Sequence, residues 1–248
     1  MRLSIKLTDI YGISRRNAKK YISDGRVCIN DKIVRKDVEI SELDEIRLNI
    51  VPVSPSVQAE ELVIARKDGI IFFYKPPFMH SERHTPEDPL TIEDLVPSAY
   101  RLISRLDHET DGILAAVEQG YEVKTLHKVY IAAVEGDFYE YLFMDNKIDA
   151  AKRKKVKVYE ETGGNAVKFS LREKYGTISI VEASLEKANR HQLRAFLAHK
   201  GFPILGDKLY GGKSFPRLML HCEQTEINGL KEYSHRSQAF ISYLKANI

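Results

Sequence analysis

The chain has 248 residues, of which 43% are hydrophobic and 29% charged, and it contains 14 Gly and 9 Pro. This composition is that of an ordinary globular protein and excludes collagen-like, low-complexity and mostly disordered chains. The net charge is only +3, but the excess lies near the N-terminus, where residues 1–36 hold ten Lys and Arg against three Asp and Glu. At roughly 100 to 200 residues per domain, the length allows one large domain or a large and a small one.

Cysteine usage and hydropathy bear on metals and on location. Cys28 and Cys222 show no Cys-x-x-Cys spacing, so they form no disulfide framework and argue against a structural zinc. No apolar run approaches the ~18 residues of a membrane-spanning helix. The first residues also lack the apolar core of a secretory signal. We therefore expect a cytoplasmic protein that holds no metal.

The first 50 residues predict a helix, a turn, a second helix and then strands. The second helix is expected over Arg15–Ser23, with Ser14 as its N-cap. Residues 26–30 alternate in polarity, and residues 32–34 follow a tight turn at Asn30-Asp31, which is a hairpin pattern.

The second helix carries a basic face. Positions i, i+1, i+4 and i+5 of a helix share one side, and here they are Arg15, Arg16, Lys19 and Lys20. From charge alone, a solvated helix face is the simpler interpretation. A basic helix beside a small hairpin also suits a phosphate backbone.

A resemblance favours the second interpretation. The segment SRRNAKKYISDGRVCINDKIVRKDVEI, residues 14–40, resembles the core of the S4-type RNA-binding domain. The positions that match its pattern are Ser14, Arg15, Ala18, Ile22, Gly25, Val27, Ile29 and Asn30. The resemblance implies that this domain binds structured RNA through the basic helix, in agreement with the clustered charge. Residues 51–60 follow with two prolines and two serines, which indicates a linker.

From residue 61 onward the chain reads as many short strands with few helices, a pattern that favours an α+β fold over a doubly wound parallel sheet. The clearest candidates are strands at Ile70–Tyr74, Val129–Val134, Ala166–Leu171 and Thr177–Val181, and a helix at His191–His199. We expect a small helix-rich N-terminal domain with a hairpin over residues 1–50. A linker over 51–60 then leads to a domain over 61–248, built on a mixed, mainly antiparallel β-sheet flanked by helices.

The most unusual string is SRLDHETDGIL at residues 104–114. On spacing alone, an Asp-capped turn is the simpler interpretation. The string, however, resembles the catalytic motif H-R-L-D-x-x-T-S-G-L of the RluA-type RNA pseudouridine synthases. Four further blocks follow the order of that family: YKPP at 74–77, KVYIAAVEG at 128–136, NRHQLR with its AHKGFPILGD and LYG tail at 189–211, and RLMLHC at 217–222.

This resemblance implies roles for single residues. Asp107 would be the catalytic carboxylate, acting either as nucleophile or as base on the ribose, and Arg194 its cationic partner. Arg105 would fill the place of the flipped nucleotide. Tyr130 would stack on the uracil and could take the proton from its carbon five, and Leu220 would line the pocket. Taken singly, Tyr130 is more simply core or edge packing and Arg194 a solvated helix residue.

The implied reaction is the isomerisation of uridine in RNA to pseudouridine, without cofactor. The second RNA-binding domain favours ribosomal over transfer RNA, and we take a monomer as the default. Three departures from the family pattern, Ser104 for His, Asp111 for Ser and Ala188-Asn189-Arg190 for Gly-Arg-Thr, keep an alternative open. That alternative is a catalytically silent RNA-binding or ribosome-assembly protein. An RNA methyltransferase would need a glycine-rich donor loop, and neither G-x-G-x-x-G nor G-x-x-x-x-G-K-S/T occurs.

Overall fold

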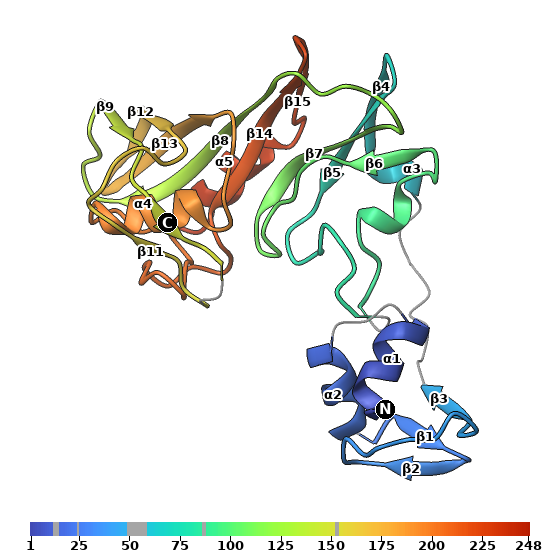
Figure 1. Cartoon of the computed structure of the whole chain (residues 1–248). Helices are drawn as coiled ribbons and strands as arrows, with labels where there is room; N and C mark the ends of the chain where they lie inside the picture. Colours follow the sequence, from blue (N-terminus) through green and yellow to red (C-terminus); the bar gives the residue numbers. More distant parts are fainter. Residues whose placement is uncertain (12–14, 24, 49–58, 86–87, 152–153) are drawn as a thin grey trace. The chain divides into compact units, whose positions relative to one another are not determined.

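The computed structural model describes residues 1–11, 15–23, 25–48, 59–85, 88–151 and 154–248. The chain divides into two compact units, one of Met1–Ser56 with Glu82–Asp94 and one of Val57–Ser81 with Leu95–Ile248 (Figure 1). Of the predicted linker, residues 51–58 lie outside the described residues, as does the predicted N-cap Ser14. The domain boundaries at residues 50 and 60 therefore stay a prediction.

The first unit combines two helices with a three-stranded antiparallel sheet of order β2-β1-β3. Its elements are α1 (Leu3–Tyr11), α2 (Arg15–Ser23), β1 (Val27–Ile29), β2 (Lys32–Val34) and β3 (Ile46–Leu48). The predicted second helix and hairpin are confirmed. Asn30 and Asp31 both adopt left-handed backbone angles, with φ of 49° and 64°, as a two-residue hairpin turn requires. Strand β3 was not predicted, so "helix-rich" overstated the helical share of this unit.

The apolar side of α2 explains which of its residues face solvent. Ala18, Tyr21 and Ile22 are buried in a small core with Leu3 and Leu7 of α1. The four charged residues of α2 lie at other positions of the helix and are exposed. We refer to them below as the basic face of α2: Arg15, Arg16, Lys19 and Lys20.

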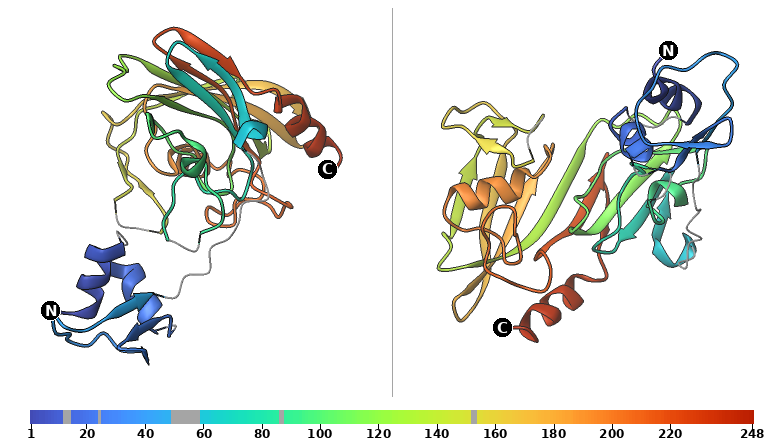
Figure 2. Two further views of the ribbon diagram at one scale, coloured as in Figure 1. Left: turned by 90° about the vertical axis from the view of Figure 1, so that its right-hand side faces the viewer. Right: turned by 90° about the horizontal axis from the view of Figure 1, so that it is seen from below.

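The second unit is built on a ten-stranded sheet in which β4-β5-β7-β14-β8-β13-β12-β9 form a continuous order, with β15 on β14 and β6 on β7 (Figure 2). Its strands are β4 (Val63–Lys67), β5 (Ile70–Lys75), β6 (Tyr100–Leu102), β7 (Asp111–Glu118), β8 (Leu126–Glu135), β9 (Tyr141–Met144), β12 (Val167–Tyr175), β13 (Ile178–Leu185), β14 (Leu220–Ile227) and β15 (Leu230–Tyr233). Within the described residues, β7 and β14 are the one parallel pair. The predicted mixed, mainly antiparallel sheet is confirmed.

The remaining elements are short. They are a β-hairpin of β10 (Ile148–Asp149) and β11 (Lys157–Val158), and the helices α3 (Ala59–Leu62), η1 (Glu93–Leu95), α4 (Gln192–His199) and α5 (Ser237–Lys245). No helix among the described residues is long and apolar enough to cross a membrane.

The parallel contact between β7 and β14 depends on Gly112. Its φ is 122°, and a side-chain carbon at this position would collide with the backbone of Cys222 on β14. Only glycine allows the two strands to approach so closely. Because β7 begins at Asp111, this contact fixes the end of the loop that carries the predicted catalytic motif.

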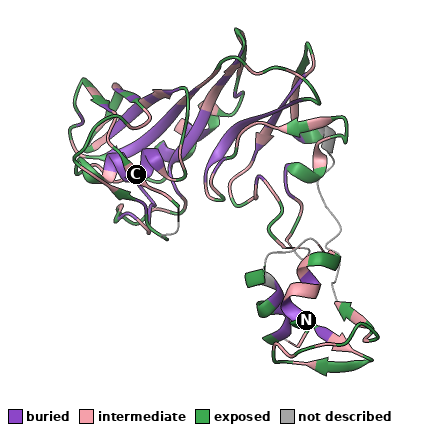
Figure 3. Ribbon diagram, viewed as in Figure 1, coloured by how far each residue is buried: buried purple, intermediate pink, exposed green. Residues whose placement is uncertain are grey.

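The buried residues of the second unit concentrate on its central strands and on helix α4 (Figure 3). All residues of α4 from Gln192 to Leu197 are buried. This includes Arg194, of which 3% is exposed, so its interpretation as a solvated helix residue is wrong. A buried guanidinium must be paired, which directs attention to its partners.

Candidate active site

Asp107 lies in the loop that joins β6 to β7, and Ser81 fixes the backbone of this loop next to Asp107. Ser81 Oγ donates a hydrogen bond to the carbonyl oxygen of Leu106 at 2.9 Å and accepts one from the amide of Leu106 at 3.0 Å. The amide of Thr110 donates to the carbonyl oxygen of Asp107 at 3.0 Å and closes the turn. The Asp107 side chain keeps 22% of its surface exposed. The carboxylate is thus fixed at its base and open toward solvent.

Lys75 anchors the same loop from strand β5. Its Nζ donates to the carbonyl oxygens of Met79 at 2.8 Å, Pro76 at 3.0 Å and His108 at 3.2 Å. The side chain is fully buried. Burial lowers the pKa of Lys75 to about 7, although the nearby carboxylates of Asp111 and Asp107 act in the opposite direction.

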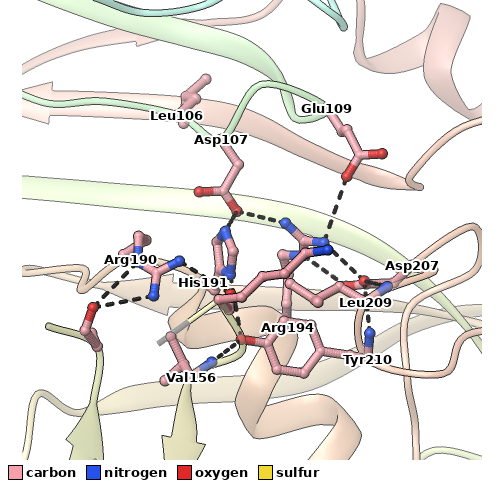
Figure 4. A network of polar contacts seen from close by, with 12 residues as sticks. Leu106, Asp107, Glu109, Val156, Arg190, His191, Arg194, Asp207, Leu209 and Tyr210 are labelled. Atoms are coloured by element: carbon pink, nitrogen blue, oxygen red, sulfur yellow. Dashed lines mark hydrogen bonds and ion pairs between the residues drawn. The ribbon is translucent and has the colours of Figure 1, made fainter. Parts of the chain in front are cut away.

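Arg194 joins two carboxylates (Figure 4). Its Nε and Nη2 donate to the two oxygens of Asp207 at 2.7 and 2.8 Å, a bidentate pair, and its Nη1 donates to Asp107 Oδ2 at 3.2 Å. Glu109 Oε2 lies 3.6 Å from Nη2. Burial alone would lower the pKa of Arg194, but Asp207 and Asp107 raise it above its usual value. The guanidinium therefore stays charged and faces Asp107, as the family pattern implied for these two residues.

Asp207 orients the arginine and had no predicted role. Its side chain is fully buried, and Oδ1 also accepts hydrogen bonds from the amides of Leu209 and Tyr210, both at 3.1 Å. The only sequence signal for Asp207 was its place in the GD-x-x-Y tail of the motif. A carboxylate that receives four donors is a rigid acceptor, so Arg194 has a fixed direction toward Asp107.

His191 and Tyr210 are two further residues that the sequence reasoning left without a role. His191 Nε2 lies 3.8 Å from Asp107 Oδ2, and its Nδ1 lies 3.3 Å from the hydroxyl of Tyr210. That hydroxyl accepts a hydrogen bond from the amide of Val156 at 2.8 Å. The Tyr210 ring also lies 5.4 Å from the guanidinium carbon of Arg194. Together these contacts bind α4 to the segment that precedes β11.

Tyr130 and Leu220 lie on one face of the sheet. Tyr130 of β8 pairs with Cys222 of β14, and Leu220 is two residues from Cys222, so the three side chains share a face. All three are buried. Burial first, and then the neighbouring Cys222 and Asp107, raise the pKa of Tyr130 well above its usual value. The phenol is therefore neutral at neutral pH.

Arg105 and the basic face of α2 are exposed, whereas Tyr130, Arg194 and Asp207 are buried. Arg105 is exposed, two residues before Asp107 in the same loop. The basic face of α2 belongs to the first unit and not to the unit that carries Asp107. Within the described residues, no group of three or more His, Cys, Asp or Glu side chains is arranged to hold a metal ion.

Asp111, the departure from the family serine, has its own partners. Arg217 Nη1 donates to its Oδ1 at 2.9 Å, His221 Nδ1 lies 3.1 Å from its Oδ2, and the hydroxyl of Tyr74 donates to Oδ2 at 3.2 Å. Burial raises the pKa of Asp111, but His221 and Arg217 outweigh that effect and lower it. Since His221 is next to Cys222 on the strand, this carboxylate lies on the sheet face opposite to Tyr130. Asp111 is thus a buried ion-pair partner and not a second carboxylate of the site.

Similar proteins share both the sequence pattern and the fold. A family model described as RNA pseudouridylate synthase matches residues 69–199, and an S4 domain model matches residues 11–46. Ribosomal large subunit pseudouridine synthase C of Haemophilus ducreyi is 24% identical over 261 residues, which cover 92% of this chain and 80% of that protein. Ribosomal large subunit pseudouridine synthase D of Borreliella burgdorferi is 26% identical over 280 residues, which cover 98% and 84%.

Among solved structures, that of human RNA pseudouridylate synthase domain containing 4 aligns with a TM-score of 0.59 at 18% identity, over 75% of this chain and 94% of that one. This likeness concerns the fold. The family match spans more than half of the chain and contains Asp107, Tyr130 and Arg194. The chain therefore belongs to the RNA pseudouridylate synthase family and carries an S4 domain near its N-terminus.

Proposed function

We propose that this protein isomerises specific uridines of ribosomal RNA to pseudouridine, with Asp107 as the catalytic carboxylate. The observation that carries this proposal is the charged contact between Asp107 and the buried Arg194, which lie 3.2 Å apart. The similar proteins named above are ribosomal large subunit pseudouridine synthases, which supports the large-subunit RNA as the target.

The chemistry sets what the site must supply. The bond between uracil N1 and ribose C1′ breaks, the uracil turns, and a bond between C5 and C1′ forms. A proton leaves C5 and one is taken up at N1, so product and substrate are isomers. No electron or group is gained from outside, which is why the proposed reaction needs no cofactor.

Asp107 suits the ribose steps. An ionised carboxylate can attack C1′ as a nucleophile or remove the proton at C2′ as a base. Arg194 stabilises the ionised form and compensates charge that develops on the sugar or the base. Because Asp207 holds the guanidinium in place, Arg194 needs no reorientation when the substrate binds.

Tyr130 and Leu220 suit the base. A neutral, largely buried phenol offers a flat ring against which the uracil can stack while it turns. The raised pKa of Tyr130 favours this stacking role over removal of the C5 proton as a phenolate. Leu220 adds an apolar wall on the same face. The exposed Arg105 is placed in the catalytic loop, where it can occupy the position of the flipped nucleotide.

RNA contacts outside the site are assigned to the basic face of α2. Four exposed cations on one helix face suit phosphate groups, and a second contact site suits a large folded RNA. We further propose residues 1–50 as the RNA-binding domain, residues 61–248 as the catalytic domain, a cytoplasmic location and a monomer. The retained carboxylate, guanidinium and phenol give no reason to favour the catalytically silent alternative.

The test is pseudouridine mapping by carbodiimide labelling and reverse transcription. Total RNA from cells with the gene, without it, and with the Asp107→Asn allele is compared. We expect one or a few stops in large-subunit ribosomal RNA to disappear without the gene and to stay absent with the Asn allele. Stops that are unchanged in all three strains, together with no product from the purified protein on ribosomal RNA, would contradict the proposal.

A further inference from the structure

The two oxygens of Asp107 are not equivalent. Arg194 Nη1 donates to Oδ2 at 3.2 Å, and His191 Nε2 approaches the same oxygen at 3.8 Å (Figure 4). Within the described residues, Oδ1 has no hydrogen-bond partner. Oδ2 is thus hydrogen-bonded to Arg194 and approached by His191, and Oδ1 is left for the substrate.

The contacts of His191 define which ring nitrogen carries the proton. If Nδ1 carried it, the lone pair of Nε2 would face the carboxylate of Asp107, which also has only lone pairs to offer. With the proton on Nε2, both contacts become favourable. Nε2–H points at Asp107 Oδ2, and Nδ1 accepts from the hydroxyl of Tyr210. We therefore assign the Nε2–H tautomer.

Tyr210 is prepared to donate to His191. Its hydroxyl accepts from the amide of Val156 at 2.8 Å, so its own proton is free to point at His191 Nδ1 at 3.3 Å. The two rings meet edge to face, with centroids 5.9 Å apart and an interplanar angle of 84°. This arrangement fixes both the tautomer and the orientation of the imidazole.

The backbone of His191 is strained in support of this placement. Its φ is 56° at the position before α4, and it makes no side-chain cap to that helix. A left-handed conformation is uncommon for residues other than glycine, and such outliers concentrate at functional sites. The conformation turns the imidazole away from a capping position and toward Asp107.

We propose that His191 is a positioning residue for the reaction: as the neutral Nε2–H tautomer set by Tyr210, it acts with Arg194 to hold Oδ2 of Asp107, so that Oδ1 is the oxygen that meets the ribose. This inference rests on the proposed function, in which Asp107 is the catalytic carboxylate. It applies equally to attack on C1′ and to removal of the C2′ proton. The 3.8 Å contact is expected to shorten when substrate fills the site, as catalytic contacts often do.

The first test separates positioning from binding. His191→Asn tolerates the left-handed backbone but is too short to reach Asp107, and we expect it to lower kcat by about 10- to 100-fold, the loss of one hydrogen bond to a charged group. KM should change less than about twofold, because the proposed role of His191 involves Asp107 and no contact with the RNA. His191→Gln, which retains an N–H donor, should recover part of the loss. Tyr210→Phe, which removes only the hydroxyl, should lower kcat by about 3- to 10-fold.

The matched control is His199→Gln on the same helix. His199 lies 3.4 Å from a largely exposed Glu160 carboxylate, at the opposite end of α4 from His191. It should leave kcat unchanged. Circular dichroism and the thermal midpoint report whether each variant is folded.

The dependence of kcat on pH distinguishes a positioning role of His191 from a purely structural one. Burial, then the cations Arg194 and Arg190, lower the pKa of His191 against the opposing effect of Asp107 and Asp207, so the imidazole is neutral at pH 7. Protonation at lower pH puts a proton on Nδ1 and removes the acceptor for Tyr210. Wild-type kcat should therefore fall on the acid side of His191 titration, and His191→Gln should lose this limb. The charged or titratable groups around the imidazole are Asp107, Arg190, Arg194, Asp207, Tyr210 and, over the Tyr210 ring, Lys155.

Comparison of Asp107→Asn with His191→Asn shows whether the proposed function or only the proposed role of His191 is wrong. If Asp107→Asn retains activity, the proposed catalytic carboxylate is wrong. If Asp107→Asn is inactive while a folded His191→Asn keeps wild-type kcat, the positioning role of His191 is wrong. A rise in KM at constant kcat would also overturn it, because that result would place His191 in contact with the RNA.

Discussion

Replacement of Asp207 by Asn tests whether Asp207, rather than Asp107, is the main counter-charge that stabilises the buried Arg194 guanidinium. The substitution keeps the shape of the side chain and removes its charge. In the structure Oδ1 accepts from Arg194 Nη2 and from the amides of Leu209 and Tyr210, while Oδ2 accepts from Arg194 Nε at 2.7 Å. If the amide oxygen takes the place of Oδ1, the new NH₂ group faces the Nε–H donor. One buried donor then has no acceptor.

The magnitude follows from burial and from the remaining partner. Removal of one member of a buried ion pair costs about 3–5 kcal/mol because the other charge is left uncompensated. Asp207 is fully buried and Arg194 nearly so, which places the pair in that class. Asp107 still contacts Arg194, so the lower figure of about 3 kcal/mol applies. For a unit of 150 to 250 residues this corresponds to a fall of about 6–12 °C in thermal midpoint.

The assay is differential scanning calorimetry of the full chain, with attention to the transition of the second unit. Asp137→Asn is the matched control, because Asp137 also pairs with a cation, Lys174 at 2.8 Å, but its side chain is 88% exposed. Exposed pairs contribute little, so this control should keep the wild-type midpoint. A midpoint for Asp207→Asn within about 2 °C of wild type would show that Asp107, and not Asp207, is the main counter-charge of Arg194. Its kcat should fall as well, since Arg194 loses its fixed direction.

Three further predictions concern catalysis, RNA binding and acid stability. Asp107→Asn should abolish pseudouridine formation while its affinity for RNA, measured by fluorescence anisotropy, stays within about twofold of wild type, because the charge and not the shape is removed; equal activity would remove Asp107 from the site. Substitution of the basic face of α2 by Gln should weaken RNA binding and reduce the slope of log Kd against log salt by about 0.7–0.9 per lost phosphate contact; an unchanged slope would place the phosphate contacts elsewhere. Asp111 has a lowered pKa in the folded state, so its contribution to the free energy of unfolding is fully present above its unfolded pKa near 3.8 and is lost as the pH falls through the lower folded value. Asp111→Ser should therefore be less stable than wild type at pH 7, by about 3 kcal/mol, with a smaller difference below pH 3 in urea titrations; a difference that is constant with pH would contradict the ion-pair origin.

For α2, local spacing was sufficient to predict the helix. Apolar Ala18, Tyr21 and Ile22 alternate with cations at helical intervals, and the helix and the hairpin that follows it form as predicted. For α4, local spacing was misleading. A lone arginine in a helix is usually solvated, but here Arg194 is buried because two distant carboxylates converge on it.

The departures from the family pattern show the same limit. Asp111 stands four residues from Asp107 in the sequence, yet strand alternation places its carboxylate on the sheet face opposite to Tyr130, paired with Arg217 and His221. His221 belongs to β14 and Arg217 to the segment just before it, so both partners come more than 100 residues later in the chain. No periodicity of the local sequence reports which face a residue takes after a turn, since a shift of one residue reverses the face.

The family, the α+β class and the candidate residues Asp107, Tyr130 and Arg194 could be inferred from the sequence, because ordered motifs and short-range periodicity are local properties of the chain. The geometry of the candidate site could not be inferred in this way, because it depends on contacts between distant segments. Asp107, His191, Arg194 and Asp207 meet through strand pairing and helix packing. The buried guanidinium of Arg194 needs a counter-charge, and Asp207 provides it. His191 approaches one oxygen of Asp107. Such long-range compensation depends on which segments the sheet brings together, and it has no signature in local spacing.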